Sequence, residues 1–165
     1  MPTWREYKGR ELNYPLWEKE LKDDYVVLIR SHHFTHDHIT FSSSPSWRNV
    51  SDYPNVNELY LIADILVSDY SSAFWDYALL GKPMFAYAYD FEQYKKSTGL
   101  LIDIEKEYPN GIQKDEMELL KLIRDMDDQE QKRKTEAFCK KYVSHPVNAT
   151  SYLLDTLANK IHLHT

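Results

Sequence analysis

The chain has 165 residues, of which 42% are hydrophobic and 28% are charged. This composition is typical of a soluble globular protein, and the length is sufficient to bury a core without disulfide bonds or metal ions. The formal net charge of −6 argues against a general nucleic-acid binder, because such proteins carry a basic face. Aromatic residues make up 14%, and the 13 tyrosines suit half-buried walls where the ring packs and the hydroxyl stays in water.

Cysteine content and hydropathy indicate the compartment. Cys139 is the only cysteine, so the chain cannot form an internal disulfide bond, which is consistent with reducing conditions. No apolar run approaches the roughly 20 residues that span a bilayer. Residues 1–24 are polar and aromatic and lack the pattern of a signal peptide. We therefore expect a cytoplasmic protein.

The first part of the chain alternates between helix and strand patterns. Apolar spacing predicts a helix over 15–22. The run Tyr-Val-Val-Leu-Ile-Arg at 25–30 is typical of a buried strand, and a short strand is expected over 47–50. Asn57 is expected to cap a helix that carries apolar residues as far as Ala63.

A strand–helix–strand unit follows and forms the centre of the predicted fold. The β-branched, apolar run at 65–67 predicts a strand buried on both faces. Residues 68–72, Ser-Asp-Tyr-Ser-Ser, form a polar turn, and helical spacing begins at Ser72. Gly81 ends that helix, and the next apolar run, 84–87, predicts a second strand.

The rest of the chain continues this alternation and then becomes helical. We expect a short helix over 91–96, a strand over 100–102 and a turn at 109–111. Three helices are then expected, over 117–123, 128–142 and 149–163. Strands alternating with helices predict an α/β fold with a doubly wound, mostly parallel sheet. We treat 1–165 as one domain that includes a helical tail from about residue 114.

The turn at residues 68–72 is the first candidate site. It stands at the carboxyl end of a predicted strand and the amino end of a predicted helix, where backbone N–H groups bind phosphate. With their hydroxyls, Ser71 and Ser72 suit a diphosphate. On the turn alone the simpler interpretation is that one of these serines merely caps the helix, because serine caps are common.

A second candidate ends a different strand. In a parallel sheet Arg30, His32 and His33 face the same crevice as the serine turn. A histidine there can transfer protons near neutral pH or stabilise a leaving phosphate, and Arg30 can hold a phosphate through its planar guanidinium group. The alternative, an exposed loop histidine without a role, stays open.

Other polar residues are weaker candidates. The histidines and aspartate of residues 33–38 superficially resemble metal ligands, but they lie in a predicted loop without a supporting framework, so we expect no metal and no cofactor. Asp76 lies opposite the apolar helix face, toward either solvent or the crevice. Asp90 most simply caps the helix that follows it. No Walker lysine loop, GxGxxG, GxSxG or HExxH motif occurs.

Several segments occur together in a characteristic order. They are Pro2–Arg5, Tyr25–His33, Asp52–Pro54, Asn57–Tyr60, Ser68–Tyr77 and Tyr87–Asp90. Over roughly residues 1–115 the chain resembles the C-terminal, nucleotide-binding half of the CDP-glycerol glycerophosphotransferase family of teichoic acid synthesis. The resemblance implies a Rossmann-like half of a GT-B enzyme. Such enzymes transfer glycerol phosphate, or a related polyol phosphate, from CDP-glycerol to a hydroxyl of a lipid-linked teichoic acid acceptor.

The resemblance also implies roles for individual residues. His32 matches the family's catalytic histidine in the Arg-x-His position. The residues implied to bind or shape the substrate site are Arg30, His33, Asp69, Ser71, Ser72 and Asp76. Ser71 and Ser72 would hold the diphosphate, and the 52–54 loop would lie near the cytidine.

Two departures from the family pattern bear on activity. The His-Gly-Thr motif of the family's N-terminal domain does not occur in this chain, and Thr98 stands where members tend to carry an arginine. We therefore expect the chain to supply the donor-nucleotide half. An N-terminal domain or a second chain would bind the acceptor. The protein would then be peripheral at the inner face of the bacterial membrane. The alternatives are a non-catalytic CDP-polyol-binding or scaffold domain, and a GT-B half that uses another sugar nucleotide.

Overall fold

The computed structural model describes residues 12–30, 44–145 and 147–162. The helices in these ranges are α1 (Tyr14–Leu21), α2 (Val56–Ile62), α3 (Ala73–Ala78), α4 (Phe91–Ser97), α5 (Ile104–Glu107), α6 (Glu116–Arg124), α7 (Asp128–Tyr142) and α8 (Ala149–His162). The strands are β1 (Val27–Ile29), β2 (Trp47–Asn49), β3 (Leu66–Ser68), β4 (Met84–Tyr87) and β5 (Ile112–Gln113).

The strands form two parallel groups. β1 pairs with β2, with Val27 opposite Trp47. β4 lies between β3 and β5 in the second group, with Leu66 opposite Met84 and Ala86 opposite Ile112. Every pair in the described part of the chain is parallel, as the alternation of strands and helices predicts.

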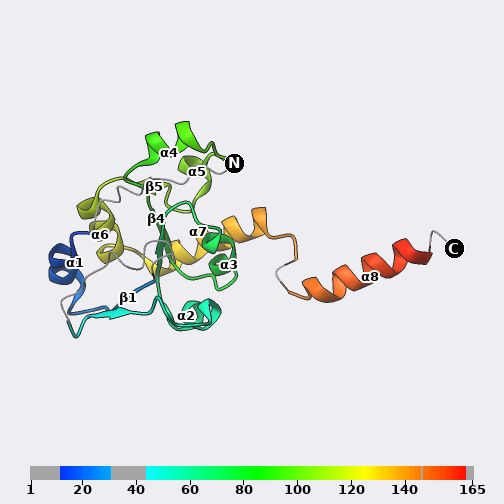
Figure 1. Cartoon of the computed structure of the whole chain (residues 1–165), viewed down its shortest axis with the longest axis horizontal. Helices are drawn as coiled ribbons and strands as arrows, with labels where there is room; N and C mark the ends of the chain where they lie inside the picture. The colour runs from blue at the N-terminus through cyan, green and yellow to red at the C-terminus, as the bar shows by residue number, and fades with distance from the viewer. Residues whose placement is uncertain (1–11, 31–43, 146, 163–165) are drawn as a thin grey trace.

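β4 separates two apolar layers because its side chains alternate between the faces of the sheet. Met84 and Ala86 join a cluster built from α3 and α7, whereas Phe85 and Tyr87 join a cluster built from α1 and α6. Figure 1 shows β4 with α1 and α6 on its left and α3 on its right. Helices on both faces of a parallel sheet confirm the prediction of a doubly wound α/β fold.

Short elements account for the errors of the sequence prediction. The strand predicted over 100–102 is wrong: Leu101 and Ile102 form a bend, and Leu101 is fully exposed although Leu100 and Ile102 pack against the core. The position beside β4 is taken by β5, which has two residues. β5 and the four-residue α5 escaped prediction because elements this short show no periodicity.

Two predicted helix caps are also wrong. Asn55, rather than Asn57, caps α2, because its side-chain oxygen accepts a hydrogen bond from the Asn57 N–H at 3.1 Å. Asp90 occupies the N-cap position of α4, but its side chain forms no capping hydrogen bond. By contrast, the helix predicted over 128–142 has the bounds of α7.

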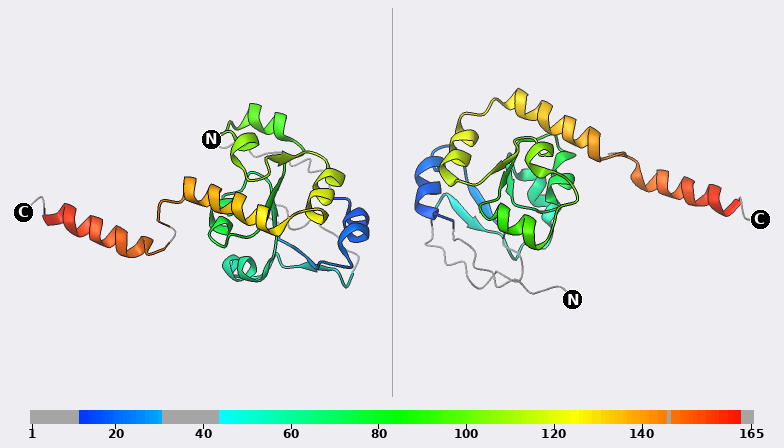
Figure 2. Two further views of the ribbon diagram at one scale, coloured as in Figure 1. Left: turned by 180° about the vertical axis from the view of Figure 1, so that it is seen from behind. Right: turned by 90° about the horizontal axis from the view of Figure 1, so that it is seen from above.

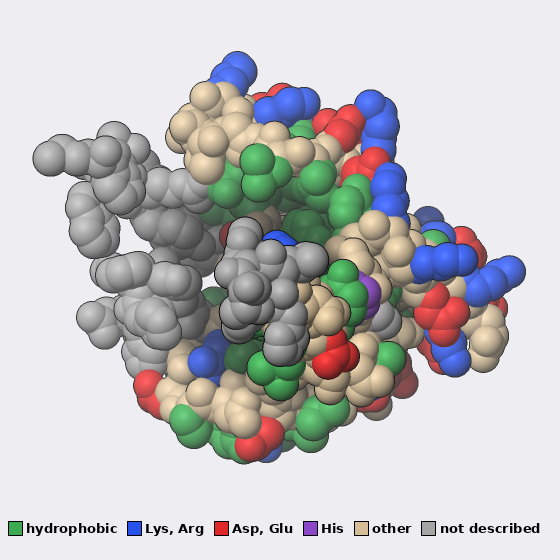
Figure 3. Space-filling model, turned by 90° about the vertical axis from the view of Figure 1, so that its right-hand side faces the viewer, with side chains coloured by type: hydrophobic (Ala, Val, Ile, Leu, Met, Phe, Trp, Pro, Cys, Tyr) green, Lys and Arg blue, Asp and Glu red, His purple; other side chains and the backbone are tan. Residues whose placement is uncertain are grey.

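The last helix stands apart from the rest of the fold. α8 extends away from the sheet in Figure 1 and in both views of Figure 2. Its leucines Leu153, Leu154 and Leu157 are exposed. No helix in the described ranges combines the length and the apolar character needed to cross a membrane. Acidic and basic side chains are interspersed on the face seen in Figure 3.

Candidate functional site

The candidate site lies where several parallel strands end. Arg30 directly follows β1, the turn at 50–53 follows β2, residues 69–72 follow β3, and residues 88–90 follow β4. The two groups of strands share one apolar layer, and the carboxyl ends of parallel strands meet at one edge, so these loops lie along the same edge. The structure therefore brings the serine turn and Arg30 to the same edge, as the sequence predicts.

Tyr70 joins the loop after β3 to the loop after β4. Its hydroxyl donates a hydrogen bond to Asp90 Oδ1 at 2.7 Å, and its ring stacks on Tyr94 with centroids 3.6 Å apart. Burial, followed by the hydrogen bond and the charge of Asp90, raises the pKa of the Tyr70 phenol. Tyr70 therefore stays neutral and donates its proton, and Asp90 fixes the two loops together instead of capping α4.

The two serines of the turn differ in their contacts. Ser71 Oγ accepts a hydrogen bond from the Ala73 N–H at 3.1 Å, so its hydroxyl proton stays available to a ligand. Ser72 occupies the N-cap position of α3, but its exposed side chain makes no capping hydrogen bond. Ser71 thus fits the simpler capping interpretation and Ser72 does not. α3 has only six residues, so any anion here depends mainly on hydroxyls and local N–H groups.

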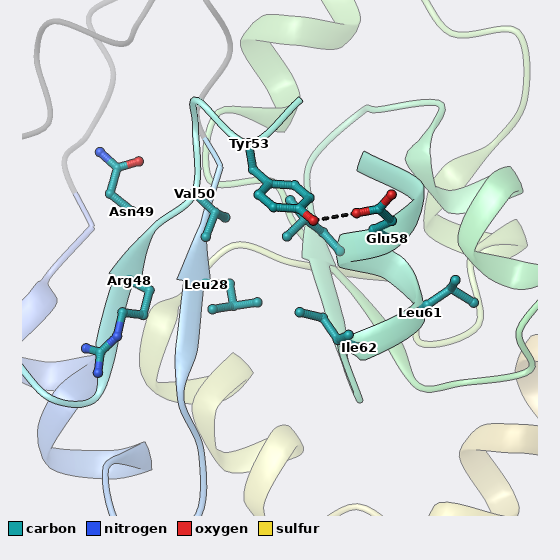
Figure 4. A pocket seen from close by; sticks show the side chains of 9 residues that line it. Leu28, Arg48, Asn49, Val50, Tyr53, Glu58, Leu61 and Ile62 are labelled. Carbon is teal, nitrogen blue, oxygen red and sulfur yellow. Dashed lines mark hydrogen bonds between the residues drawn. The ribbon is translucent and has the colours of Figure 1, made fainter. Parts of the chain in front are cut away.

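Arg30 fixes the loop that follows β2. Its Nη1 donates hydrogen bonds to the main-chain oxygens of Val50, at 3.4 Å, and Tyr53. The Tyr53 hydroxyl in turn donates to a carboxylate oxygen of Glu58 on α2, as Figure 4 shows. This hydrogen bond raises the pKa of Tyr53, so the phenol stays neutral. The arginine predicted to hold phosphate therefore also orders the 52–54 loop.

A pocket of about 550 Å³ opens beside this loop. Its apolar wall comes from β1, the end of β2 and α2, and includes Leu28, Val50 and Ile62. Arg48, Asn49, Tyr53 and Glu58 supply polar groups at its margin. The pocket is therefore mainly apolar with a polar rim.

The charges of Arg30 and Asp76 act on Tyr60 in opposite directions. Burial and the Asp76 carboxylate raise the pKa of its phenol, while the Arg30 guanidinium group lowers it. The ring packs edge-on against Tyr77 with centroids 5.7 Å apart. Asp76 is exposed, and its charge reaches Tyr60 on α2.

The charge of Asp69 reaches two neighbouring phenols. Its exposed carboxylate contributes to the raised pKa of Tyr70 and of Tyr108, whose pKa rises to about 12 chiefly through burial. Sequence reasoning assigned no role to Tyr60 or Tyr70 and placed Tyr53 only within the 52–54 loop, and the high tyrosine content was the one general signal for them.

Some predicted site residues lie outside the described residues. These are His32, the predicted catalytic residue, His33 and the remaining histidines of the 33–38 loop. In the described ranges, no three His, Cys, Asp or Glu side chains are grouped in a way that could hold a metal ion.

The sequence as a whole matches one protein family. Residues 1–158 match the family described as CDP-Glycerol:Poly(glycerophosphate) glycerophosphotransferase. The chain belongs to this family. The match extends well beyond the 1–115 region on which the resemblance was first based.

Curated relatives act in teichoic acid synthesis. A teichoic acid poly(glycerol phosphate) polymerase of Staphylococcus epidermidis is 34% identical over 172 residues, covering 96% of this chain and 24% of the relative. A teichoic acid glycerol-phosphate transferase of Staphylococcus aureus is 34% identical over 77% of this chain and 35% of its own length. A poly(ribitol-phosphate) polymerase of Bacillus spizizenii is 30% identical over 75% of this chain. The chain thus spans only about a quarter to a third of the first two relatives.

Solved structures of the wall teichoic acid polymerase TagF share the fold. One has a TM-score of 0.78 and 30% identity, and the match covers 98% of this chain and 42% of that one. A TagF variant soaked with CDPG (CDP-glycerol) has a TM-score of 0.78 and 31% identity, over 99% of this chain and 43% of that one. The Rossmann-like fold expected from the sequence is therefore confirmed.

Proposed function

We propose that this chain is the donor-nucleotide half of a CDP-glycerol glycerophosphotransferase, with CDP-glycerol or a related CDP-polyol as its ligand. The observation that carries the proposal is the meeting of the loops after β1, β2, β3 and β4 in a member of this family. Arg30 links the first two through Tyr53, and Tyr70 links the last two through Asp90. A crevice built this way is where open α/β sheets bind nucleotides.

The chemistry assigns the ligand's parts to these loops. Ser71 and Ser72 donate hydroxyl hydrogen bonds to the diphosphate, and Arg30 contributes positive charge with the nitrogens that Tyr53 does not occupy. Asp69, Asp76 and His33 shape the site that receives the diphosphate. The 52–54 loop contacts the cytidine.

The reaction is an in-line phosphoryl transfer. The acceptor hydroxyl oxygen forms a bond to the phosphorus that carries glycerol, and the bond from this phosphorus to the oxygen shared with CMP breaks. His32 either takes the proton of the acceptor hydroxyl or, when charged, stabilises the leaving phosphate of CMP. A second half, completing a GT-B arrangement at the inner face of the membrane, presents the lipid-linked acceptor.

Calorimetric titration of the chain with CDP-glycerol, CDP-ribitol and CMP tests ligand binding. Replacing both Ser71 and Ser72 with alanine should weaken binding by about 1–3 kcal/mol, the contribution of hydrogen bonds to a charged group. The matched control replaces the exposed Ser144 and Ser151 with alanine and should leave affinity unchanged. Equal affinity of the Ser71/Ser72 variant and the parent would exclude the turn as the phosphate site.

Turnover separates an enzyme half from a binding domain. The assay uses membranes that carry acceptor, with the missing half supplied by the corresponding part of a relative. Loss of product on His32→Ala with retained CDP-glycerol affinity supports catalysis by His32, and full activity removes that residue from the mechanism. Binding without turnover in the parent points instead to a non-catalytic CDP-polyol-binding or scaffold domain. Preference for a UDP sugar over CDP-glycerol would indicate a different glycosyltransferase half.

A further inference from the structure

The local hydrogen bonds of the serine turn join it to the start of α3. The Ala73 N–H donates to Ser71 Oγ at 3.1 Å, and the Trp75 N–H donates to the Ser72 main-chain oxygen at 3.0 Å. α3 has only six residues, and a helix this short does not hold its own first turn in place. The position of the two serine hydroxyls therefore depends on contacts between the turn and the rest of the fold.

Tyr70 makes such a contact with the neighbouring loop. It directly precedes Ser71, so the two Cα atoms lie one peptide unit, about 3.8 Å, apart. Its hydroxyl donates to Asp90 Oδ1 at 2.7 Å, and its ring stacks on Tyr94 with centroids 3.6 Å apart and planes 16° apart. A side chain that is held at both its ring and its tip restricts the main chain beside it, so the clamp on Tyr70 also holds Ser71.

The partners of Tyr70 are themselves fixed to the core. The Asp90 main-chain oxygen accepts the Tyr94 N–H at 2.9 Å, so both partners belong to the first turn of α4. Phe91, which follows Asp90, is 1% exposed and lies in the same apolar cluster as Met84 of β4. The Tyr70 ring also stacks on Phe91 with centroids 6.5 Å apart. Tyr70 thus connects the serine turn to a rigid part of the sheet.

The direction of the hydroxyl proton decides how Tyr70 can act on a ligand. A phenol has one O–H, and here it is donated to Asp90, so it is not available to an anion. Burial, followed by the hydrogen bond to Asp90, raises the pKa of this phenol, so it keeps its proton at neutral pH. Ser71 accepts from the Ala73 N–H and keeps its own proton available. Tyr70 therefore acts through the serine and not by contact with the ligand.

We propose that Tyr70 is a positioning residue for the donor diphosphate. Held by Asp90 and Tyr94, it keeps the serine turn in the arrangement that presents both hydroxyls to the ligand. A turn that is ordered before the ligand arrives binds it more tightly, because less conformational entropy is lost on binding. The identity of the ligand rests on the proposed function, whereas the order of the turn does not.

Tyr70→Phe tests the proposal because it removes the hydroxyl and keeps the ring. NMR relaxation of the ligand-free chain measures the order of the Ser71 and Ser72 amides. Their order parameters should fall from the rigid value of about 0.85 toward the flexible range below about 0.6. In calorimetric titration the affinity for CDP-glycerol should fall about three- to tenfold, since the turn must then be ordered on binding.

Substitutions of Asp90 test the same contact from its other side. Asp90→Asn keeps an oxygen that accepts the hydroxyl proton, so it should retain most of the order and of the affinity. Asp90→Ala removes the acceptor and should match Tyr70→Phe. The double variant should lose no more than either single variant, because both remove one shared interaction. If Tyr70→Phe fails to fold, the comparison of Asp90→Asn with Asp90→Ala still decides the outcome.

Thr135→Val separates positioning from a general loss of stability. Thr135 is fully buried on α7 and donates to the main-chain oxygen of Lys82, which follows α3, whereas the serine turn precedes α3. This variant should unfold more easily than the parent but keep the order of the turn and the affinity for CDP-glycerol.

Three results would overturn the proposal. They are unchanged order of the Ser71 and Ser72 amides in Tyr70→Phe, unchanged affinity although the turn is disordered, and an equal loss of affinity in Thr135→Val. If the parent does not bind CDP-glycerol, the proposed function fails and the ligand named here falls with it, while the order parameters still decide whether Tyr70 holds the turn. If replacing both serines weakens binding and Tyr70→Phe does not, the proposed function stands and this inference fails.

Discussion

Replacing Tyr70 with phenylalanine tests the link between the loops after β3 and β4. The change removes one hydroxyl and its 2.7 Å hydrogen bond to Asp90 while keeping the ring stacked on Tyr94. A hydrogen bond to a charged partner contributes about 1.5–3 kcal/mol, and Asp90 is partly solvated, so we expect a loss of about 1–2 kcal/mol in the free energy of unfolding near pH 7.5. For a chain of this length each kcal/mol lowers Tm by about 2–4 °C.

The pH dependence of the same variant has a defined sign. The folded-state pKa of Tyr70 lies above its unfolded value near 10, so its contribution is complete below pH 10 and is lost as pH rises toward the folded pKa. For one proton, the free energy of unfolding changes by at most about 1.4 kcal/mol per pH unit. The difference between parent and Tyr70→Phe should therefore shrink between pH 10 and pH 11.

Urea unfolding at pH 7.5 and pH 11 measures both effects. Tyr152→Phe, at an exposed phenol on α8, is the matched control and should match the parent at either pH. A loss below about 0.5 kcal/mol at pH 7.5, the range of ordinary surface changes, would refute the role given to this hydrogen bond. A difference that grows with pH would refute the assigned direction of the pKa shift.

Three further predictions, made with four substitutions, test the turns and the core. Gly111→Ala should cost more stability than Gly81→Ala, although both residues have a positive φ. A Cβ at Gly111 would lie 3.0 Å from the Glu105 main-chain oxygen. At Gly81 a Cβ would meet only the flexible Glu136 side chain, at 3.9 Å. Thr135→Val should cost about 1–3 kcal/mol, because it leaves the Lys82 main-chain oxygen without the hydroxyl that donates to it at 3.0 Å. Phe85→Ala should cost about 3–5 kcal/mol by opening a cavity beneath β4. Urea unfolding checks all three, and equal losses for the two glycines, or a Thr135→Val variant as stable as the parent, would contradict the geometry.

Long elements with clear spacing were predictable from the sequence. The bounds of α7 follow from a run of helix-forming residues, and Asp127 caps it as a short acidic residue before a helix should. The strand at 84–87 was equally clear. The helix predicted to end at Gly81 ends earlier, at Ala78, and Gly81, with a φ of +65°, lies in the turn that follows. Residues 100–102 misled because an apolar run does not show which of its members are covered: Leu100 and Ile102 pack against the core, but Leu101 between them is exposed.

The site was predictable in position but not in its contacts. Strand ends and polar turns placed Arg30 and the serines at one edge. The bond between Tyr70 and Asp90 depends on the pairing of Ser68 with Ala86, which aligns the ends of β3 and β4, and no local pattern encodes that register. Likewise, the apolar run at 25–30 predicts a strand but not its pairing with residues 47–49.

The position of α8 determines how the protein moves through solution. A compact chain of this length has a radius of gyration of about 15 Å, and a 14-residue helix adds an arm of about 21 Å that stands clear of the sheet. Such an arm raises the frictional drag without raising the mass. A monomer of 19.6 kDa should therefore elute from a sizing column calibrated with spherical proteins as if it were larger. Light scattering or sedimentation equilibrium, which report mass directly, will tell this elongated monomer from a dimer.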